Sequence, residues 1–243
     1  MHKHVKCQEN ISIIIDCAWD DVHSETAVKS LAQQIMFCYG INKRHAHPAA
    51  LYITGLGPNL RGHLTKMLFD NWQGVSVSSD EYIVNTAEFC AAPSSGDTPK
   101  QLVYLTSDAE ETLQVLDRSC VYVIGGIVDR NRLKGATYAK AVAQGVRTAK
   151  LPIKENFALS ATHVLTVNHV YEILLNFVES NNWADAIQKV LPKRKGPVSQ
   201  STSSRPAAEQ PPVDQGSGDE KAAELSKEEK QAPDKAPELI TES

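Results

Sequence analysis

The sequence predicts an α/β domain with a mostly parallel sheet and helices on both of its faces. Short apolar runs rich in β-branched residues recur along the chain, and glycine or polar residues follow most of them. The segments between these runs have the apolar spacing of amphipathic helices. When strands alternate with helices, each helix is a crossover connection that places neighbouring strands parallel.

Six short segments have the composition of strands. Residues 11–15 (ISIII) and 121–124 (VYVI) are continuous apolar runs, which are typical of strands buried on both faces of a parallel sheet. The segment at 75–77 is the weakest of the six. In chain order, the predicted strands are 11–15, 51–54, 75–77, 102–105, 121–124 and 146–150.

The segments between the strands have helical spacing. Val28, Leu31 and Ile35 would form one buried stripe, and Gly40 is the expected stop signal of that helix. Asn59 is the expected N-cap of the next helix. Acidic residues at the start of 110–116 suit the N-terminal end of a helix dipole. The predicted helices are 23–38, 59–69, 110–116, 136–144, 167–179 and 183–190, with 80–89 as an ambiguous short helix.

Composition divides the chain into a short lead (1–10), one domain (11–195) and a tail (196–243). The tail is rich in Pro, Ser, Glu and Lys and has no aromatic residue, so it is predicted to be disordered. It holds 5 basic and 10 acidic residues, and subtracting these from the totals of 25 and 29 leaves 20 and 19. The domain is therefore near neutral, and net charge alone does not predict a nucleic-acid partner.

Several classes of protein are disfavoured. No apolar run approaches the roughly 18–20 residues that span a bilayer, so a soluble protein without a membrane partner is expected. The start lacks the pattern of a signal peptide or mitochondrial presequence, which favours a nuclear and/or cytoplasmic location. The five cysteines form no CxxC pair and fit reduced thiols, and no metal site is predicted.

Residues 121–153 are the predicted functional stretch. Gly125 and Gly126 follow a strand, and Asp129 is the only acid in residues 121–154. The same range holds seven basic residues, Arg130, Arg132, Lys134, Lys140, Arg147, Lys150 and Lys154. Ligands of open parallel sheets bind beyond the carboxyl ends of the strands, so the loops at 106–108, 125–131 and 151–153 predict a site for an anionic partner.

Simpler readings of the same residues stay open. The glycine pair could be an ordinary turn, Asp129 could form a surface ion pair, and the basic residues could be a solvated face. The GxGxxG, GxxxxGK[ST] and GxSxG motifs are absent.

Seven segments together carry a family resemblance: IIIDCAWDD (13–21), LYITGLG (51–57), LVYLTSD (102–108), VYVIGGIVDRNRLKG (121–135), VRTAKLPI (146–153), VLTVNHVYEILL (164–175) and VLPKRK (190–195). In this order they resemble the tRNA position-9 purine N1-methyltransferases of the SPOUT superfamily, and IGGIVDRNR is the most specific of them. The resemblance covers residues 11–195. It implies a SPOUT fold, whose parallel sheet has its C-terminal half tied in a trefoil knot.

The resemblance also implies the ligands and their residues. S-adenosylmethionine would bind against the knot loops, with Leu105, Leu151 and Leu165 around its adenine. The implied cofactor contacts are Leu105, Thr106, Gly125, Gly126, Asp129, Arg130, Asn131, Arg132, Leu133, Thr137, Leu151, His163, Val164 and Leu165. Asp129 matches the family's proposed general base, which would accept the N1 proton of guanine 9. Arg130, Arg132, Lys134 and Arg147 would bind tRNA phosphates, and no metal is implied.

Two departures from the family pattern affect these expectations. Thr137 stands where many relatives have Cys, a change expected to be tolerated. Relatives usually carry a long basic segment before the first strand, whereas here that strand begins about ten residues from Met1, so weakened tRNA binding is expected. The resemblance favours a monomer. A weakly active tRNA-binding module and a nucleotide-binding enzyme built on Gly125 and Gly126 remain alternatives.

Overall fold

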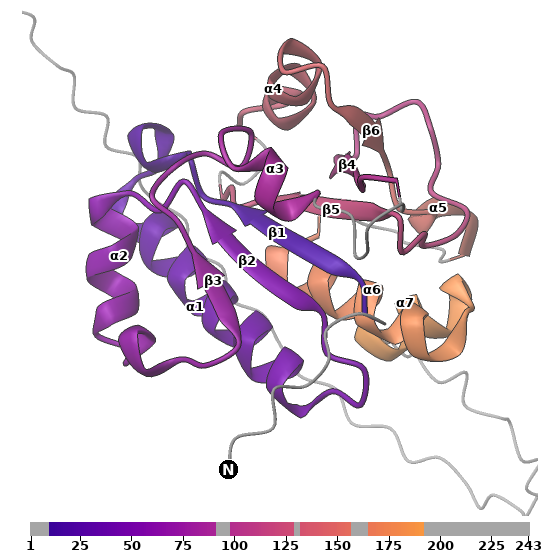
Figure 1. Cartoon of the computed structure of the whole chain (residues 1–243), viewed down its shortest axis with the longest axis horizontal. Coiled ribbons are helices and arrows are strands. Elements are labelled where there is room, and N and C mark those ends of the chain that lie inside the picture. Colours follow the sequence, from indigo (N-terminus) through magenta and orange to yellow (C-terminus); the bar gives the residue numbers. More distant parts are fainter. Residues whose placement is uncertain (1–9, 91–97, 129–131, 157–164, 192–243) are drawn as a thin grey trace, which may run out of the picture. The chain divides into compact units, whose positions relative to one another are not determined.

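A computed structural model describes residues 10–90, 98–128, 132–156 and 165–191 of the chain (Figure 1). The chain divides into two units, Met1–Gly196 and Pro197–Ser243, and every described residue lies in the first. The predicted disorder of 196–243 therefore falls outside the described residues.

Six parallel strands form one sheet in the order β3-β2-β1-β5-β4-β6. Central β1 pairs with β2 and β5, and Asp16 at its end lies opposite Thr54 and Gly125. Parallel pairing places all the strand ends that bear the predicted loops at one edge. The strands are β1 (Ser12–Asp16), β2 (Ala50–Thr54), β3 (Val75–Val77), β4 (Gln101–Leu105), β5 (Cys120–Gly125) and β6 (Arg147–Ala149).

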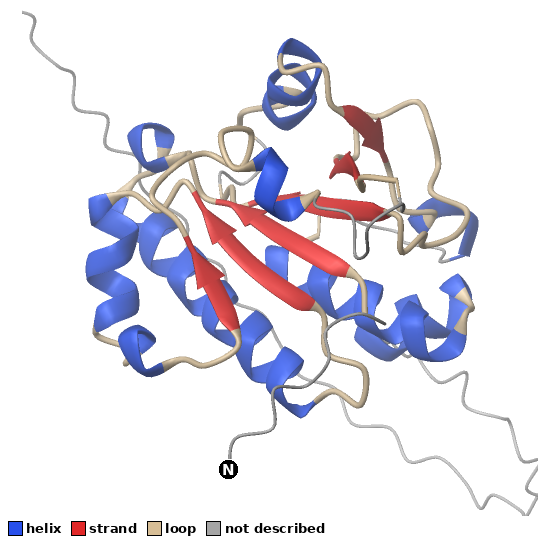
Figure 2. Cartoon of the chain, viewed as in Figure 1, coloured by secondary structure: helices blue, strands red, loops and turns tan. Residues whose placement is uncertain are grey.

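Helices cover both faces of the sheet, which confirms the predicted fold class (Figures 1 and 2). Successive strand residues point to opposite faces, so Ile13 and Ile15 belong to one core and Ile14 to the other. The first core is closed by α1 (Glu25–Arg44), α2 (Pro58–Thr65), α6 (Val167–Ser180) and α7 (Trp183–Val190). The second contains residues of α3 (Thr86–Phe89) and α4 (Ala136–Ala143). The remaining short elements are α5 (Ile153–Asn156) and the 3-10 turns η1 (Asp20–Val22) and η2 (Phe69–Asn71).

The helix predicted at 110–116 is wrong. Lys150 N–H donates to Glu111 O and Leu113 N–H donates to Lys150 O, each at 2.8 Å, so this segment forms a parallel bridge beside the end of β6. Leu113 is buried as a result. Pairing with a distant strand thus satisfies the backbone groups and overrides the local helical signal.

Other helix ends also differ from the predictions. Helix α1 runs through Gly40 and ends at Arg44, where the buried Asn42 side chain bonds the backbone N–H (2.8 Å) and carbonyl (3.0 Å) of Ala49. The ending therefore depends on this tertiary contact rather than on glycine. The predicted helix at 59–69 is divided into α2 and η2, and 80–89 contains only α3. The trefoil knot stays a prediction.

Candidate functional site

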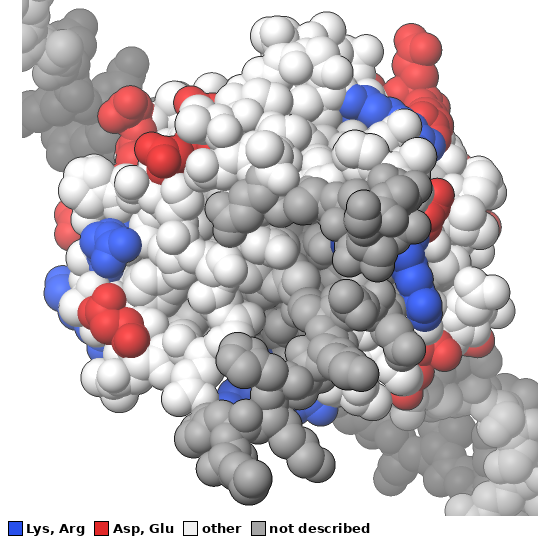
Figure 3. Space-filling view, viewed as in Figure 1, with Lys and Arg blue, Asp and Glu red and all other residues white. Residues whose placement is uncertain are grey.

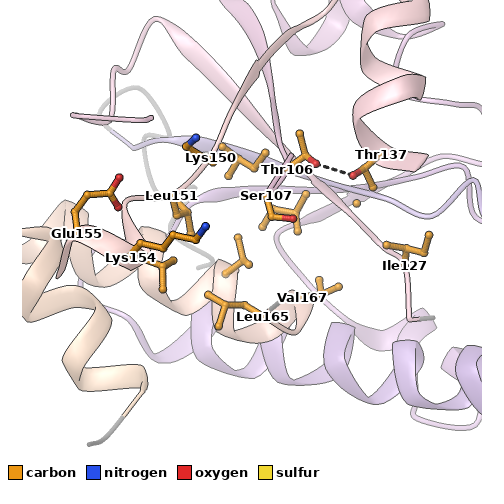
Figure 4. A pocket seen from close by; sticks show the side chains of 15 residues that line it. Thr106, Ser107, Ile127, Thr137, Lys150, Leu151, Lys154, Glu155, Leu165 and Val167 are labelled. Carbon is orange, nitrogen blue, oxygen red and sulfur yellow. Dashed lines mark hydrogen bonds between the residues drawn. The ribbon is translucent and has the colours of Figure 1, made fainter. Parts of the chain in front are cut away.

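A cavity of about 280 Å³ lies at the carboxyl ends of β4, β5 and β6 (Figure 4). Leu105 and Thr106 border it from β4 and the residue that follows, Gly125 from the end of β5, and Leu151 from the segment after β6. Residues of α5 and of the start of α6 complete the wall. The cavity therefore occupies the edge of the sheet where parallel α/β proteins bind ligands.

The cavity brings together several of the predicted cofactor contacts. Those that line it are Leu105, Thr106, Gly125, Thr137, Leu151 and Leu165. Gly126, Arg132 and Leu133 are described but are not among the lining residues. The remaining predicted contacts, Asp129, Arg130, Asn131, His163 and Val164, lie outside the described residues.

The lining is apolar along its walls and polar at defined points. The Thr137 hydroxyl donates to the Thr106 hydroxyl at 2.9 Å, shown by the dashed line in Figure 4. Lys154 and Glu155 contribute charged side chains from α5. A small molecule with an aromatic part and hydrogen-bonding groups suits this combination.

Sequence reasoning missed part of this wall. Val167 and Val170 of α6 line the cavity, and their three-residue spacing in a predicted helix was an available signal. Lys154 and Glu155 were missed as lining residues because α5 was not predicted. A four-residue helix leaves too little periodicity to detect.

Gly126 packs against β1 rather than facing the cavity. Its N–H donates to the carbonyl of Asp16 at 2.7 Å, and a Cβ at this position would lie 2.8 Å from the same oxygen. Two residues later, Val128 N–H donates to His23 Nε2 at 3.0 Å. The Gly126 amide is thus used within the fold, which argues against a phosphate cradle on the glycine pair.

A buried charged cluster lies behind Gly125. The Asp16 carboxylate is fully buried and accepts from the Tyr104 hydroxyl (2.8 Å) and from Lys140 Nζ (2.8 and 3.0 Å). Burial, and then the Asp16 charge, raises the pKa of Tyr104 well above its ordinary value, so this hydroxyl stays protonated and donates. The sequence showed Asp16 only as the end of a strand and Lys140 only as one base among several.

The residues predicted to bind tRNA differ in their surroundings. Arg132 and Lys134 are exposed, and Arg130 lies outside the described residues. The Arg147 guanidinium makes two bonds to the Glu111 carboxylate, one of them from Nε at 3.0 Å. This hydrogen bonding between the two side chains lowers the pKa of Glu111 and raises the pKa of Arg147. On the face drawn in Figure 3, Lys and Arg side chains are scattered among Asp and Glu.

Gly125→Ala is expected to lower the free energy of unfolding by about 1–3 kcal/mol, the usual effect of overpacking. The added Cβ would lie 2.7 Å from Thr137 Cγ2 and 3.1 Å from the Tyr104 hydroxyl oxygen. Urea denaturation followed by circular dichroism measures the change. Gly62→Ala is the matched control, because nothing lies within 4 Å of its added Cβ and alanine favours the helix there. Equal stability of Gly125→Ala and wild type would contradict the close packing.

The described part of the chain lacks two kinds of feature. It contains no group of three or more His, Cys, Asp or Glu side chains suited to hold a metal ion. None of its helices has the length and apolar character needed to cross a membrane.

Known proteins of one family resemble this chain. A family model described as tRNA (guanine(9)-N(1))-methyltransferase TRM10/TRM10A matches residues 1–196. The tRNA methyltransferase 10 homolog A of Rattus norvegicus is 38% identical over 200 residues, which cover 82% of this chain and 56% of the relative. The tRNA (guanine(9)-N1)-methyltransferase of Schizosaccharomyces pombe is 37% identical over 190 residues, covering 77% and 60%. The chain thus spans somewhat more than half the length of these relatives.

Solved structures of the same family resemble the fold. The crystal structure of spTrm10(74) has a TM-score of 0.68 at 34% identity, covering 79% of this chain and 98% of that chain. The complex of full-length spTrm10 with SAH has a TM-score of 0.66 at 34% identity, covering 75% and 95%. A Trm10 structure from Thermococcus kodakaraensis, at 19% identity and a TM-score of 0.56, is similar in fold alone.

Proposed function

The chain belongs to the tRNA (guanine(9)-N(1))-methyltransferase family TRM10/TRM10A, and from this premise we propose that it methylates N1 of guanine 9 in tRNA with S-adenosylmethionine. The family match over residues 1–196 is the observation that carries the proposal. The partners in this reaction are tRNA and the cofactor. We further propose that the protein acts as a monomer in the nucleus and/or cytoplasm.

The cavity fits S-adenosylmethionine in chemistry. A similar Trm10 structure is a complex with SAH, which is the demethylated form of this cofactor. Leu105, Leu151 and Leu165 offer apolar contacts for an adenine, and the hydroxyls of Thr106 and Thr137 offer hydrogen bonds. The volume of about 280 Å³ is just below the range of about 300–1,000 Å³ that is usual for small-molecule pockets. When bound, the cofactor supplies a methyl group activated by its sulfonium.

Asp129 is the residue we assign to proton transfer. Guanine N1 carries a proton at neutral pH, and this proton must leave when the methyl group is added. A carboxylate within hydrogen-bonding reach accepts such a proton, an effect of about 10²–10⁴-fold on rate. The bond from Val128 N–H to His23 Nε2 holds the backbone immediately before Asp129.

Basic residues around this segment are proposed to bind tRNA phosphates. Arg132 and Lys134 are exposed on the connection between β5 and α4. Arg147 would exchange its Glu111 carboxylate for a phosphate. Arg130 completes the proposed set.

Primer extension on an unmodified tRNA tests the proposed reaction. Incubation with the protein and S-adenosylmethionine is expected to produce a stop at position 9, because a methyl group on N1 blocks base pairing. Calorimetric titration with S-adenosylhomocysteine shows in parallel that the sample is folded and binds the cofactor product. A sample that binds this product but gives no stop on any tRNA would exclude the enzymatic function. Tight ATP binding without binding of S-adenosylhomocysteine would favour a nucleotide-binding enzyme instead.

A further inference from the structure

Helix α4 is attached to the domain largely through polar side chains. Of its eight residues, all of them described, Ala141 alone is buried. One side of the helix carries Thr137, Lys140 and Gln144, which are spaced three and four residues apart. Gln144 directly follows the last residue of the helix. Each of these three residues bonds to a different segment of the domain. With so little apolar area buried, these bonds decide where the helix sits.

The central bond of this stripe is the ion pair between Lys140 and Asp16. Lys140 Nζ donates to both carboxylate oxygens, at 3.0 and 2.8 Å, and its side chain is only 15% exposed. Tyr104 donates to the same carboxylate at 2.8 Å. Because Asp16 is fully buried at the end of the central strand, its charge requires a partner at this point.

Further contacts restrict the Lys140 ammonium to one place. Glu81 lies 3.1 Å from Nζ, and the rings of Trp19 and Tyr82 lie 5.0 and 5.6 Å from it. Two carboxylates and two ring faces therefore surround the cation. The Tyr82 hydroxyl also donates to Gln144 Oε1, so the same segment holds the end of the helix. A shift of α4 along its axis would break all of these contacts together.

Thr137 connects this attachment to the cavity. It lies one turn before Lys140, lines the cavity and donates to Thr106 at 2.9 Å (Figure 4). Gly125 lies between the two sites, since a Cβ there would be 2.7 Å from Thr137 Cγ2 and 3.1 Å from the Tyr104 hydroxyl oxygen. The cavity wall is thus in direct packing contact with the cluster around Asp16.

We propose that Lys140 is a positioning residue for cofactor binding, whose ion pair with Asp16 fixes α4 and thereby the cavity wall at Thr137. Lys140 is not among the lining residues, so it acts through the helix rather than by touching the cofactor. The inference rests on the proposed function, because it assumes that the cavity binds S-adenosylmethionine.

Lys140→Met is expected to weaken the binding of S-adenosylhomocysteine about tenfold, the effect of a mid-range coupling between contacting groups. Isothermal titration calorimetry measures it at a temperature below the melting transition of every variant. Lys140→Arg keeps the charge and is expected to retain most of the affinity. The double variant Asp16→Asn with Lys140→Met leaves no buried charge unpaired. It is expected to fold and to bind S-adenosylhomocysteine more weakly than the wild type, as Lys140→Met does.

Two controls separate positioning from general destabilisation. Lys189→Met removes the 3.1 Å pair with Glu179, away from the cavity lining, and Leu60→Ala weakens the core under α2. Both are expected to bind S-adenosylhomocysteine like the wild type. Unchanged affinity in Lys140→Met, or an equal loss in Leu60→Ala, would overturn the positioning role while the wild type still binds. Failure of the wild type itself to bind would instead overturn the proposed function.

Discussion

Asp129→Asn is expected to slow the N1 methylation of guanine 9 by about 10²–10⁴-fold, the usual contribution of a general base. Asparagine keeps the size and shape of the side chain but cannot accept the proton that guanine N1 must release. Single-turnover methylation of an unmodified tRNA, with protein and cofactor in excess, measures this step. Calorimetry should show nearly unchanged affinity for S-adenosylhomocysteine.

A second aspartate at a strand end provides the matched control. Asp108 is exposed in the loop after β4 and is not among the residues that line the cavity. Asp108→Asn should therefore leave the methylation rate unchanged. A substrate with adenine at position 9 adds a chemical control, since its N1 has no proton to remove and a residual rate there should depend less on Asp129. Parallel loss of rate and cofactor affinity in Asp129→Asn would indicate a structural role.

Lys140→Met is also expected to lower the free energy of unfolding by about 3–5 kcal/mol, the effect of breaking one side of a buried ion pair. The variant leaves the Asp16 carboxylate, which is fully buried, with its Tyr104 and Ala18 hydrogen bonds but without a countercharge. Urea denaturation followed by circular dichroism measures the loss. Adding Asp16→Asn should restore part of it, because no unpaired charge then remains inside the protein.

The exposed pair between Lys189 and Glu179 is the control for this measurement. Both side chains are about half exposed, and water screens such pairs. Lys189→Met is therefore expected to unfold at the same urea concentration as the wild type. A loss in Lys140→Met no larger than that in Lys189→Met would mean that the Asp16 charge is solvated in the native state.

The sequence pattern predicted the strands well, because the apolar run that marks a buried strand consists of neighbouring residues. The runs at 11–15 and 121–124 are almost entirely apolar and are therefore expected to be buried. They form the central strands β1 and β5. The helix predicted at 110–116 failed because the backbone of Lys150, directly after β6, pairs with Glu111 and Leu113, and the local sequence does not contain this partner. Gly40 was likewise overridden, since α1 is held by packing along its buried stripe and ends at the contact between Asn42 and Ala49.

The site was predictable to a similar extent. Leu105, Gly125 and Leu151 follow from strand ends and family motifs, and all three line the cavity. The cavity-lining residues of α5 and α6 depend on how these helices pack over the edge of the sheet. The rule that ligands bind beyond the carboxyl ends of parallel strands does not predict this packing. Roles for Asp129, Arg130, Asn131, His163 and Val164 stay predictions.

The sequence by itself determined the α/β class, the strand and helix order and the family, because periodicity and ordered motifs are properties of neighbouring residues. Only the tertiary structure decided that Lys140 forms an ion pair with Asp16, 124 positions away, and that Arg147 forms an ion pair with Glu111. Both pairs join segments that come together only when β1, β4, β5 and β6 assemble in this order. The energy of a buried charge depends on that assembly, because burial removes the water that would otherwise solvate it.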